Sequence, residues 1–401
     1  MSWEYKTLDQ LGEVSRGRSK HRPRNDPSLF GGDYPFIQTA DVKAANFYIT
    51  EYDTTYNEKG LAQSKLWHPG TLCITIAANI ADTGILAMDA CFPDSVMGFL
   101  PYEGVADVRF VKYCFDILQQ NCKKISQGAA QDNLSWEKLS TILFPAPPIE
   151  VQKRIADMLS AYDDLIENNQ KQIKLLEEAA QRLYKEWFVD LRFPGHETTP
   201  ITDGIPEGWK KDRADAFFNM SIGKTPPRAE KQWFTDGGNG TPWISISDMG
   251  NYGTYVFDTA EALTVEAISK HNMKVVPADT VLVSFKLTVG RVSITTTDTC
   301  TNEAIAHFLI SNSMLREYTY LYLKCFEYDS LGNTSAISKA VNSKIIKGMP
   351  FVMPDNATIT QFHKIAKPIF DAIKDKQSMN MKLAEARDRL LPKLMNGEIE
   401  V

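Results

Sequence analysis

The chain has 401 residues, of which 43% are hydrophobic and 23% are charged, and its formal net charge is −6. These values are typical of globular proteins and exclude a disordered or collagen-like chain, while the length suits about two to four domains. The negative balance excludes a binder that relies on overall positive charge, so any contact with nucleic acid must come from local basic patches.

The chain begins MSWEYKTLDQ, which contains no apolar segment typical of a secretion signal. Its longest apolar stretch, residues 71–92, is interrupted by Asn79, Asp82 and Asp89, which argues against a membrane span. The six cysteines form no CxxC pair and no spacing suited to zinc. We therefore expect reduced thiols, a cytoplasmic location and no membrane contact.

The first element of interest is a basic segment. Five cations lie within nine residues: Arg16, Arg18, Lys20, Arg22 and Arg24. Gly17 and Pro23 indicate a loop rather than a helix. Arginine donates paired hydrogen bonds to guanine edges and to phosphates, so such a loop can both read and anchor DNA. An isolated run of this kind is more often a solvated surface.

Short apolar runs bounded by Gly, Pro, Asp and Asn then occur at residues 35–42 and 71–77, and they predict β-strands. Residues 109–120 predict a helix. Asparagine and glutamine can pair with adenine, which makes Gln38, Asn79 and Gln131 candidates for base contacts, although each is equally compatible with plain surface.

From residue 149 to about residue 189 the apolar period becomes helical. The predicted seam consists of Ile155, Leu159, Tyr162, Ile166, Ile173, Leu176 and Leu183. A seam sustained over more than four heptads is typical of a coiled coil, and about forty helical residues span roughly 60 Å. A helix of this length with an apolar stripe needs a partner.

The second half repeats this order. Lys224 and Arg228 follow Gly223, residues 243–246 and 280–285 predict strands, and residues 315–327 predict a helix. A second long helix follows, with a seam at Ile365, Ile369, Met379, Leu383 and Leu390. Asn169 and Lys376 are polar seam positions of the kind that fix register, and Pro368 predicts a kink. Further candidate DNA contacts in this half are Ser245, Ser247, Lys286, Arg291 and Lys344.

The two halves align at an offset of roughly 206 to 210 residues. Residues 35–42 match residues 242–249, Cys91 matches Cys300, and Pro145 matches Pro354. The period is too long for a solenoid, so it indicates a duplicated module. We expect a domain at residues 1–148, a helix at 149–191, a domain at 192–356 and a helix at 357–401.

The expected fold is α+β: two pseudo-symmetric mixed α/β domains joined by two long antiparallel coiled-coil helices. The most compact path for the second helix runs back along the first, which relates the domains by an approximate two-fold axis. Duplex DNA also has two-fold axes, so this arrangement suits two half-sites separated by a fixed gap.

Signatures of catalysis are missing. The sequence contains no GxxxxGK[ST], GxGxxG, HExxH or GxSxG motif, and its six histidines are scattered singly. We therefore expect no catalytic residues and no metal ligands, and favour recognition over catalysis.

At this point the sequence resembles the specificity (S) subunit of type I restriction–modification enzymes over nearly its whole length. The matching motifs are Gly-Lys-Thr-Pro-Pro-Arg at residues 223–228, Pro-Trp-Ile-Ser-Ile-Ser-Asp at 242–248, the segment 145–155, and Leu-Leu-Pro-Lys-Leu-Met-Asn-Gly-Glu-Ile at 390–399. One departure is the entry to the second helix. There Gln361 matches Gln152, but the double proline of the first copy is missing.

The resemblance implies a non-catalytic subunit that contacts double-stranded DNA, with each target-recognition domain reading one half of a split site and the helices setting the gap. It also implies two modification (methyltransferase) subunits and restriction subunits as partners. S-adenosylmethionine, ATP and Mg²⁺ are then expected on those partners, and no cofactor is expected in this chain.

Two alternatives are left open by the residues themselves. A coiled-coil protein–protein scaffold without DNA recognition explains the helices and the net charge but not the recurrence of basic loops. An enzyme of unrecognised type, such as a nuclease, is the third hypothesis. Salt-dependent retention on DNA that is lost when Arg18, Arg22 and Arg24 are changed to Ala separates the first from the scaffold.

Overall fold

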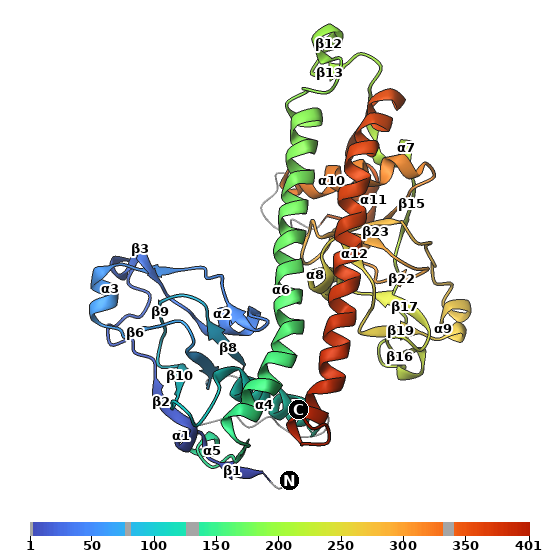
Figure 1. Ribbon diagram of the computed structural model, residues 1–401. Coiled ribbons are helices and arrows are strands. Elements are labelled where there is room, and N and C mark those ends of the chain that lie inside the picture. Colours follow the sequence, from blue (N-terminus) through green and yellow to red (C-terminus); the bar gives the residue numbers. More distant parts are fainter. Residues whose placement is uncertain (1–2, 77–81, 126–135, 332–340) are drawn as a thin grey trace. The chain divides into compact units, whose positions relative to one another are not determined.

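The structure is a computed structural model that describes residues 3–76, 82–125, 136–331 and 341–401 (Figure 1). The chain divides into two compact units. Unit 1 comprises Met1–Asn168 and Asn380–Val401, and unit 2 comprises Asn169–Met379. Both boundaries fall inside the long helices α6 (Ile149–Tyr184) and α12 (Asn356–Met395), so each unit contains one half of each helix.

Unit 1 is built on a five-stranded sheet. Its order is β2 (Gly12–Arg16), β10 (Val96–Pro101), β7 (Leu72–Thr75), β8 (Thr83–Leu86) and β4 (Tyr48–Ile49). Neighbouring strands are antiparallel except for β8 and β4, which are parallel. The helix α4 (Val108–Ile125) contributes Phe110 and Phe115 to the core beside this sheet.

Unit 2 repeats this sheet strand by strand. Its order is β15 (Asn219–Ile222), β23 (Ile305–Leu309), β20 (Val281–Ser284), β21 (Val292–Thr295) and β18 (Tyr255–Val256). The last pair is again parallel and the others antiparallel. The helix α10 (Arg316–Cys325) takes the place of α4. The duplication and the mixed α/β character are thus confirmed at the level of topology, which the apolar runs alone could not define.

Smaller elements complete each unit. In unit 1 they are β1 (Glu4–Lys6) paired with β11 (Phe144–Ala146), α1 (Leu8–Leu11), η1 (Pro27–Leu29), β3 (Phe30–Pro35), α2 (Thr39–Ala44), β5 (Thr55–Tyr56), α3 (Glu58–Ala62), β6 (Leu66–Trp67), β9 (Ala90–Cys91) and α5 (Trp136–Leu139). In unit 2 they are the π-helical turn Lys185–Val189, η3 (His196–Thr198), β12 (Ile201–Thr202), β13 (Ile205–Pro206), β14 (Lys210–Arg213) paired with β24 (Pro350–Met353), α7 (Ala214–Phe217), η4 (Lys231–Trp233), β16 (Phe234–Asp236), β17 (Thr241–Ile244), α8 (Ile246–Tyr252), β19 (Glu261–Leu263), α9 (Val265–Lys270), β22 (Cys300–Thr301), η5 (Ser313–Leu315), η6 (Tyr328–Leu331) and α11 (Ser343–Lys347).

The prediction of a strand over residues 35–42 was wrong beyond its first residue. β3 ends at Pro35 and α2 begins at Thr39, and the matching segment of unit 2 likewise passes from β17 into α8. The cause is a carboxylate three residues into the helix. Asp41 accepts a hydrogen bond from the Gln38 N–H at 2.6 Å, and Asp248 accepts one from the Ser245 N–H at 2.8 Å. These reciprocal caps start a helix inside an apolar run that reads as a strand.

The predicted match between Cys91 and Cys300 is confirmed by their positions in the two units. Cys91 bridges to Phe36 in a parallel sense, and Cys300 pairs in a parallel sense with Trp243. Both thiols are buried and free, as are those of Cys73 and Cys114, while the thiol of Cys325 is free and exposed. Burial raises the pKa of Cys300 to about 11, which keeps that thiol protonated and unreactive.

The long helices pack against each other in an antiparallel sense within each unit. In unit 1, Arg387 pairs with Asp163, and the Asn380 side chain donates to the Ile166 carbonyl at 3.4 Å. In unit 2, the Trp187 ring lies 5.7 Å from that of Phe362. Within unit 1, residue numbers thus rise along α6 from Asp163 to Ile166 as they fall along α12 from Arg387 to Asn380, which confirms the predicted antiparallel pairing.

The predicted seam of α6 agrees with burial. Ile155, Leu159 and Ile166 are buried, whereas Tyr162, Ile173, Leu176 and Leu183 are partly buried. The seam of α12 was wrong at two positions, because Ile365 is 48% and Met379 is 51% exposed. The side chains buried in their place are Ile359, Phe362, Ala366, Phe370 and Ile373. Ile369, Leu383 and Leu390 are partly buried.

The predicted match between the two halves was also wrong at the entry to α12. Phe144 of β11 and Phe351 of β24 are both buried and occupy equivalent strands. Matching them pairs Pro147 with Pro354 and places Ile359 opposite Gln152. The proposed match of Pro145 with Pro354, and of Gln152 with Gln361, was therefore two positions out: Gln152 is buried, whereas Gln361 is exposed. α12 runs without interruption through the exposed Pro368.

A buried histidine makes the stability of unit 2 depend on pH. The His307 ring lies between Ser221 Oγ, 2.8 Å from Nδ1, and Thr301 Oγ1, 2.7 Å from Nε2. Burial, with help from Lys274 and Lys347, lowers the pKa of His307 from 6.5 to about 4. The folded state therefore holds the neutral ring, while the unfolded state binds a proton below pH 6.5.

We expect unit 2 to be fully stabilised by this site above pH 6.5 and to lose about 2–3 kcal/mol through it as the pH falls from 7 to 4.5. The measurement is urea denaturation at both pH values, with the amides of β15 and β23 followed by hydrogen exchange. His307→Gln, which cannot titrate, should show a loss smaller by that amount. An equal loss in both proteins would show that His307 is not the titrating group.

Candidate nucleic-acid interface

The topology brings four strand ends together at one edge of each sheet, which we call the loop edge. In unit 1 it is where β2 and β7 end and where β10 and β8 begin. In unit 2 it is where β15 and β20 end and where β23 and β21 begin. The basic segment of each half leaves its sheet at this edge.

The two basic segments make equivalent backbone hydrogen bonds at the point where they leave their sheets. The Gly17 N–H donates to the Val96 carbonyl at 2.8 Å and the Arg18 N–H to the Phe92 carbonyl at 2.9 Å. In unit 2, the Gly223 N–H donates to Ile305 at 3.0 Å and the Lys224 N–H to Thr301 at 2.9 Å.

Glycine is required at the start of both segments because the chain that leads into β10 or β23 passes very close. A Cβ at Gly17 would lie 2.4 Å from the carbonyl oxygens of Phe92 and Pro93, and one at Gly223 would lie 2.1 Å from that of Asn302. Any side chain would push the segment off the edge. The Gly-Arg and Gly-Lys pairs are therefore structurally equivalent positions in the two units.

The five cations of the unit 1 segment fall into two groups. Arg22 donates to the carbonyls of Ser19 and His21 at 2.7 and 2.8 Å, and Arg24 pairs with Asp94 at 2.7 Å. These two hold the segment in shape. The other three are exposed and form no side-chain hydrogen bond or ion pair with any residue that the structure describes: Arg16, Arg18 and Lys20.

The segment is fixed before any ligand arrives. Ser64 Oγ donates to the Arg18 carbonyl at 2.8 Å, and the His21 N–H donates to Gln63 Oε1 at 2.9 Å. Asp26 accepts from the Ser28 N–H at 2.9 Å and from His21 at 2.8 Å, and these hydrogen bonds lower the pKa of Asp26 to about 2. A fixed loop that presents unpaired cations loses little entropy on binding a phosphate backbone.

The unit 2 segment differs in how its cations are used. Lys224 Nζ donates to the His271 carbonyl at 2.6 Å. Arg228 donates to both oxygens of Glu261 at 2.8 and 2.7 Å, and its guanidinium lies 4.3 Å from the Phe234 ring and 4.5 Å from the Trp243 ring. Both cations thus contribute to the packing of unit 2, and the sequence alone gave no sign of these partners.

The remaining candidate DNA-contact residues of unit 2 differ in whether their side chains are already engaged within the fold. Ser245 Oγ is engaged with Asp248 in the helix cap, at 2.6 Å. Arg291 is partly buried and donates to the Ile246 carbonyl at 2.6 Å. Ser247 and Lys286 are exposed near the loop edge. Lys344 lies on α11, which ends beside Arg213, ahead of β15 and so toward the opposite end of the sheet.

In unit 1, Gln38 is exposed and lies beside the basic segment, because Ile37 and Arg18 donate to the neighbouring carbonyls of Cys91 and Phe92. Asn79 and Gln131 lie outside the described residues. One cation that the sequence did not single out is Lys65, which lies 3.6 Å over the Trp67 ring and 3.4 Å from Ser15 Oγ, next to the end of β2. No local signal marks it, because its position depends on strand pairing.

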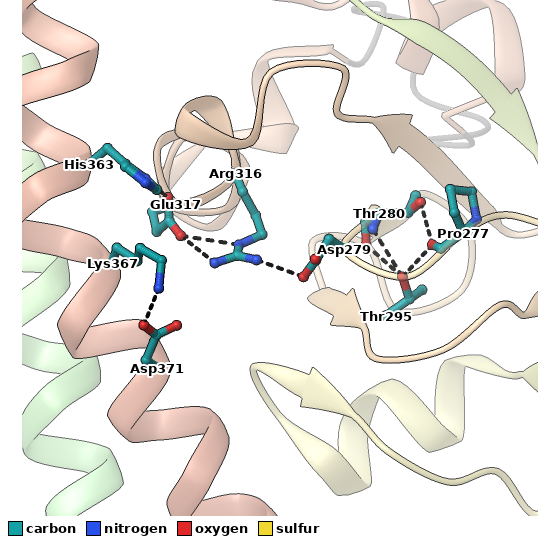
Figure 2. A network of polar contacts seen from close by, with 9 residues as sticks. All are labelled: Pro277, Asp279, Thr280, Thr295, Arg316, Glu317, His363, Lys367 and Asp371. Carbon is teal, nitrogen blue, oxygen red and sulfur yellow. Dashed lines mark hydrogen bonds and ion pairs between the residues drawn. The ribbon is translucent and has the colours of Figure 1, made fainter.

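A polar network fixes α10 against α12 in unit 2 (Figure 2). The Glu317 carboxylate is fully buried and accepts from Arg316 at 2.7 Å and from His363 on α12 at 2.7 Å. Arg316 also donates to Asp279 at 2.7 Å. Burial opposes the charge, but Glu317 and Asp279 raise the pKa of Arg316 above its ordinary value.

Unit 1 has a related set of ion pairs at the equivalent arginine, Arg109. Arg109 pairs with Asp107 at 3.1 Å and with Asp157 on α6 at 2.8 Å. In each unit, therefore, charged side chains at the start of the sheet-covering helix tie that helix to one long helix: Arg109 to Asp157 in unit 1 and Glu317 to His363 in unit 2. The loop edge is thereby held in a fixed position relative to the half-helices of its own unit.

Among the described residues, no group of three or more His, Cys, Asp or Glu side chains is arranged to hold a metal ion. Within the same residues, no helix is both long enough and apolar enough to cross a membrane.

Comparison with known proteins gives a consistent result. The family model for the type I restriction modification DNA specificity domain matches residues 1–178 and again residues 206–383, once for each copy of the duplicated module. The type I restriction enzyme MjaIX specificity subunit of Methanocaldococcus jannaschii is 27% identical, covering all of this chain and 94% of that protein. The HindI specificity subunit of Haemophilus influenzae is 24% identical over 97% of this chain and 98% of that protein.

Among solved structures, the S subunit of a type I restriction-modification system from M. genitalium is similar with a TM-score of 0.55. The match covers 98% of this chain and 96% of that one, at 14% sequence identity. At this identity the likeness concerns the fold: two mixed α/β domains with two long helices packed together.

Proposed function

Because the chain belongs to the type I restriction–modification DNA specificity family, it is a DNA specificity subunit with two target recognition domains, and we propose that each domain reads one half of a split DNA site. The subunit is a non-catalytic component of its complex. The cofactors of the reaction reside on the modification and restriction subunits.

The observation that carries the proposal is the loop edge. The two main sheets have the same strand order, and in each the first strand of that order continues into a Gly-Arg or Gly-Lys segment. The two segments make equivalent backbone hydrogen bonds where they leave the sheet. In unit 1 this segment presents Arg16, Arg18 and Lys20 without partners among the described residues. Unpaired cations on a fixed loop suit phosphate contact and guanine contact.

The two half-sites should differ in sequence. Near its loop edge, unit 1 presents Gln38 and three cations that have no partner in the described part of the chain, whereas in unit 2 Lys224 and Arg228 bond within the fold. Different side chains at equivalent positions contact different base edges. We therefore expect an asymmetric site, with unit 1 drawing more of its affinity from charge.

The long helices have two roles in this proposal: they set the gap between half-sites, and they dock two modification subunits. Support for docking comes from apolar side chains that α6 leaves exposed in both units: Met158, Leu165 and Leu175. An exposed apolar stripe on a long helix is suited to a partner protein.

The test is selection of bound duplexes from a random-sequence pool by the full chain in complex with its modification subunits. The expected product is a gapped motif with two unequal halves and a fixed spacing. A single contiguous motif, or a pool that stays random, would contradict the proposal. The scaffold alternative predicts the random pool and gives no role to the recurring loop edge.

A further inference from the structure

The loop that joins β20 to β21 at the loop edge of unit 2 carries an unusual side chain. Leu287 is 95% exposed, more than any other large apolar side chain in the described part of the chain. Its φ angle is +60°, in the left-handed region that bulky residues avoid. A fully exposed leucine in this conformation contributes no packing to the fold, so its presence calls for a function elsewhere.

Hydrogen bonds at the base of the loop fix its conformation, with the Leu287 side chain directed to solvent. Ser284 Oγ donates to the Thr288 carbonyl at 2.5 Å and accepts from the Arg291 N–H at 3.0 Å. The Gly290 N–H donates to the Ser284 carbonyl at 2.9 Å, and the Phe285 N–H donates to Ala304 at 2.9 Å. Leu287 therefore stands at the tip of a loop whose base is fixed by the sheet.

The loop that carries Leu287 also carries two cations and one other exposed apolar side chain, Val289, which is 37% exposed. Lys286 is exposed next to Leu287, and Arg291 lies at the other end of the loop. The nearby carboxylate of Glu303 is already engaged by Thr225, and its pKa is lowered first by that hydrogen bond and further by Lys286 and Arg228. An apolar tip between cations is complementary to a duplex, which has charged phosphates at its rim and apolar methyl groups in its major groove.

Building on the proposed function, we propose that Leu287 is a base-contacting specificity residue of unit 2, which enters the major groove and packs against the C5 methyl group of a thymine. The thymine methyl is the apolar feature that distinguishes base edges in that groove. Lys286 beside it supplies a phosphate contact that guides the tip into place. Unit 2 thereby reads its half-site partly by apolar contact, whereas unit 1 presents cations.

The experiment pairs a protein change with a DNA change. Leu287→Gly removes the side chain and suits the left-handed backbone, so the loop and the fold are retained. The probes are duplexes that carry the site selected by the wild-type complex, with each thymine in turn replaced by uracil, which lacks only the methyl group. Ile201→Ala, on the half-exposed residue of β12, is the matched control.

For the wild-type complex, uracil at one position of one half-site should weaken binding about three- to tenfold, as expected for loss of one buried methyl contact. Leu287→Gly should weaken binding to the unmodified site by the same factor and lose its sensitivity to that uracil. Ile201→Ala should behave like wild type.

Unchanged uracil sensitivity in Leu287→Gly would overturn the inference, whether or not its affinity falls. A wild-type complex that selects a site but tolerates every uracil would also overturn it while leaving the proposed function intact. Failure to select any site would overturn both.

Discussion

Changing Arg387 to Ala should lower the free energy of unfolding by about 3–5 kcal/mol, the range found when one partner of a buried ion pair is removed. Arg387 pairs with Asp163, which is only 2% exposed and also accepts a hydrogen bond from the Tyr113 hydroxyl at 2.5 Å. Without Arg387 the buried carboxylate keeps the Tyr113 hydrogen bond but loses its counter-ion. Urea denaturation of the full chain, with hydrogen exchange in the first half of α6 as the local reporter, measures the loss.

The control is Arg389→Ala, two residues away on the same helix. Arg389 is 77% exposed and pairs with Glu385 one turn before it at 2.5 Å. Exposed pairs of this kind contribute about 0.3–0.5 kcal/mol, so this change should be nearly silent. Equal effects of the two substitutions would show that the Asp163–Arg387 pair does not hold the helices together.

The second copy indicates how to replace the pair. In the register that matches Phe144 to Phe351, Asp163 corresponds to Phe370 and Arg387 corresponds to Ala180. Both Phe370 and Ala180 are buried in the core of unit 2. The double change Asp163→Phe with Arg387→Ala should therefore recover at least half of the stability lost in Arg387→Ala. A polar pair in one unit and an apolar pair in the other also prevent the helix halves from exchanging register.

Changing Arg16, Arg18 and Lys20 together to Ala should weaken DNA binding by about 100-fold at 0.15 M salt and reduce the slope of log K against log salt by about 2.7. These three cations are exposed and unpaired among the described residues, so their loss removes phosphate contacts without removing a contact of the fold. Binding of the modification-subunit complex to its selected site at several salt concentrations measures both quantities.

A matched control changes Lys210, Lys211 and Lys393 to Ala, because these are equally exposed cations away from the loop edges. The net charge change is identical, so the control separates local contact from overall charge. If both triple variants lose affinity equally, the basic segment has no special role. Arg22 and Arg24 are left intact because they bond within the segment and their loss would disturb its shape.

What could be predicted from the sequence depended on repetition and period. The duplicated module, the helices α4 and α10 and the seam of α6 follow from patterns that recur along the chain. The seam of α12 was wrong at Ile365 and Met379. The match of Pro145 with Pro354 was two residues out because it rested on an isolated proline, whereas the buried Phe351 in the strand before α12 corresponds to Phe144.

Contacts between side chains that lie far apart in the sequence could not be predicted from it. Arg228 reads as a free cation until the fold brings Glu261, Phe234 and Trp243 to it. Likewise, Leu287 reads as one more apolar residue near a strand, and only its exposure and backbone angle distinguish it. Charge identity is visible in a sequence, but charge availability depends on which side chains the fold places nearby.

The central claim is that two DNA-reading domains are held at a fixed spacing by the pair of long helices. The most direct test is to insert seven residues into both helices, between Asn168 and Asn169 and between Met379 and Asn380. Seven residues lengthen each helix by about 10.5 Å, or about three base pairs. Selection from a random-sequence pool should return both half-motifs unchanged, with the gap longer by about three base pairs. A seven-residue insertion in the turn between β12 and β13 is the control and should leave the gap as in the wild type. An unchanged gap in the helix variant would contradict the account.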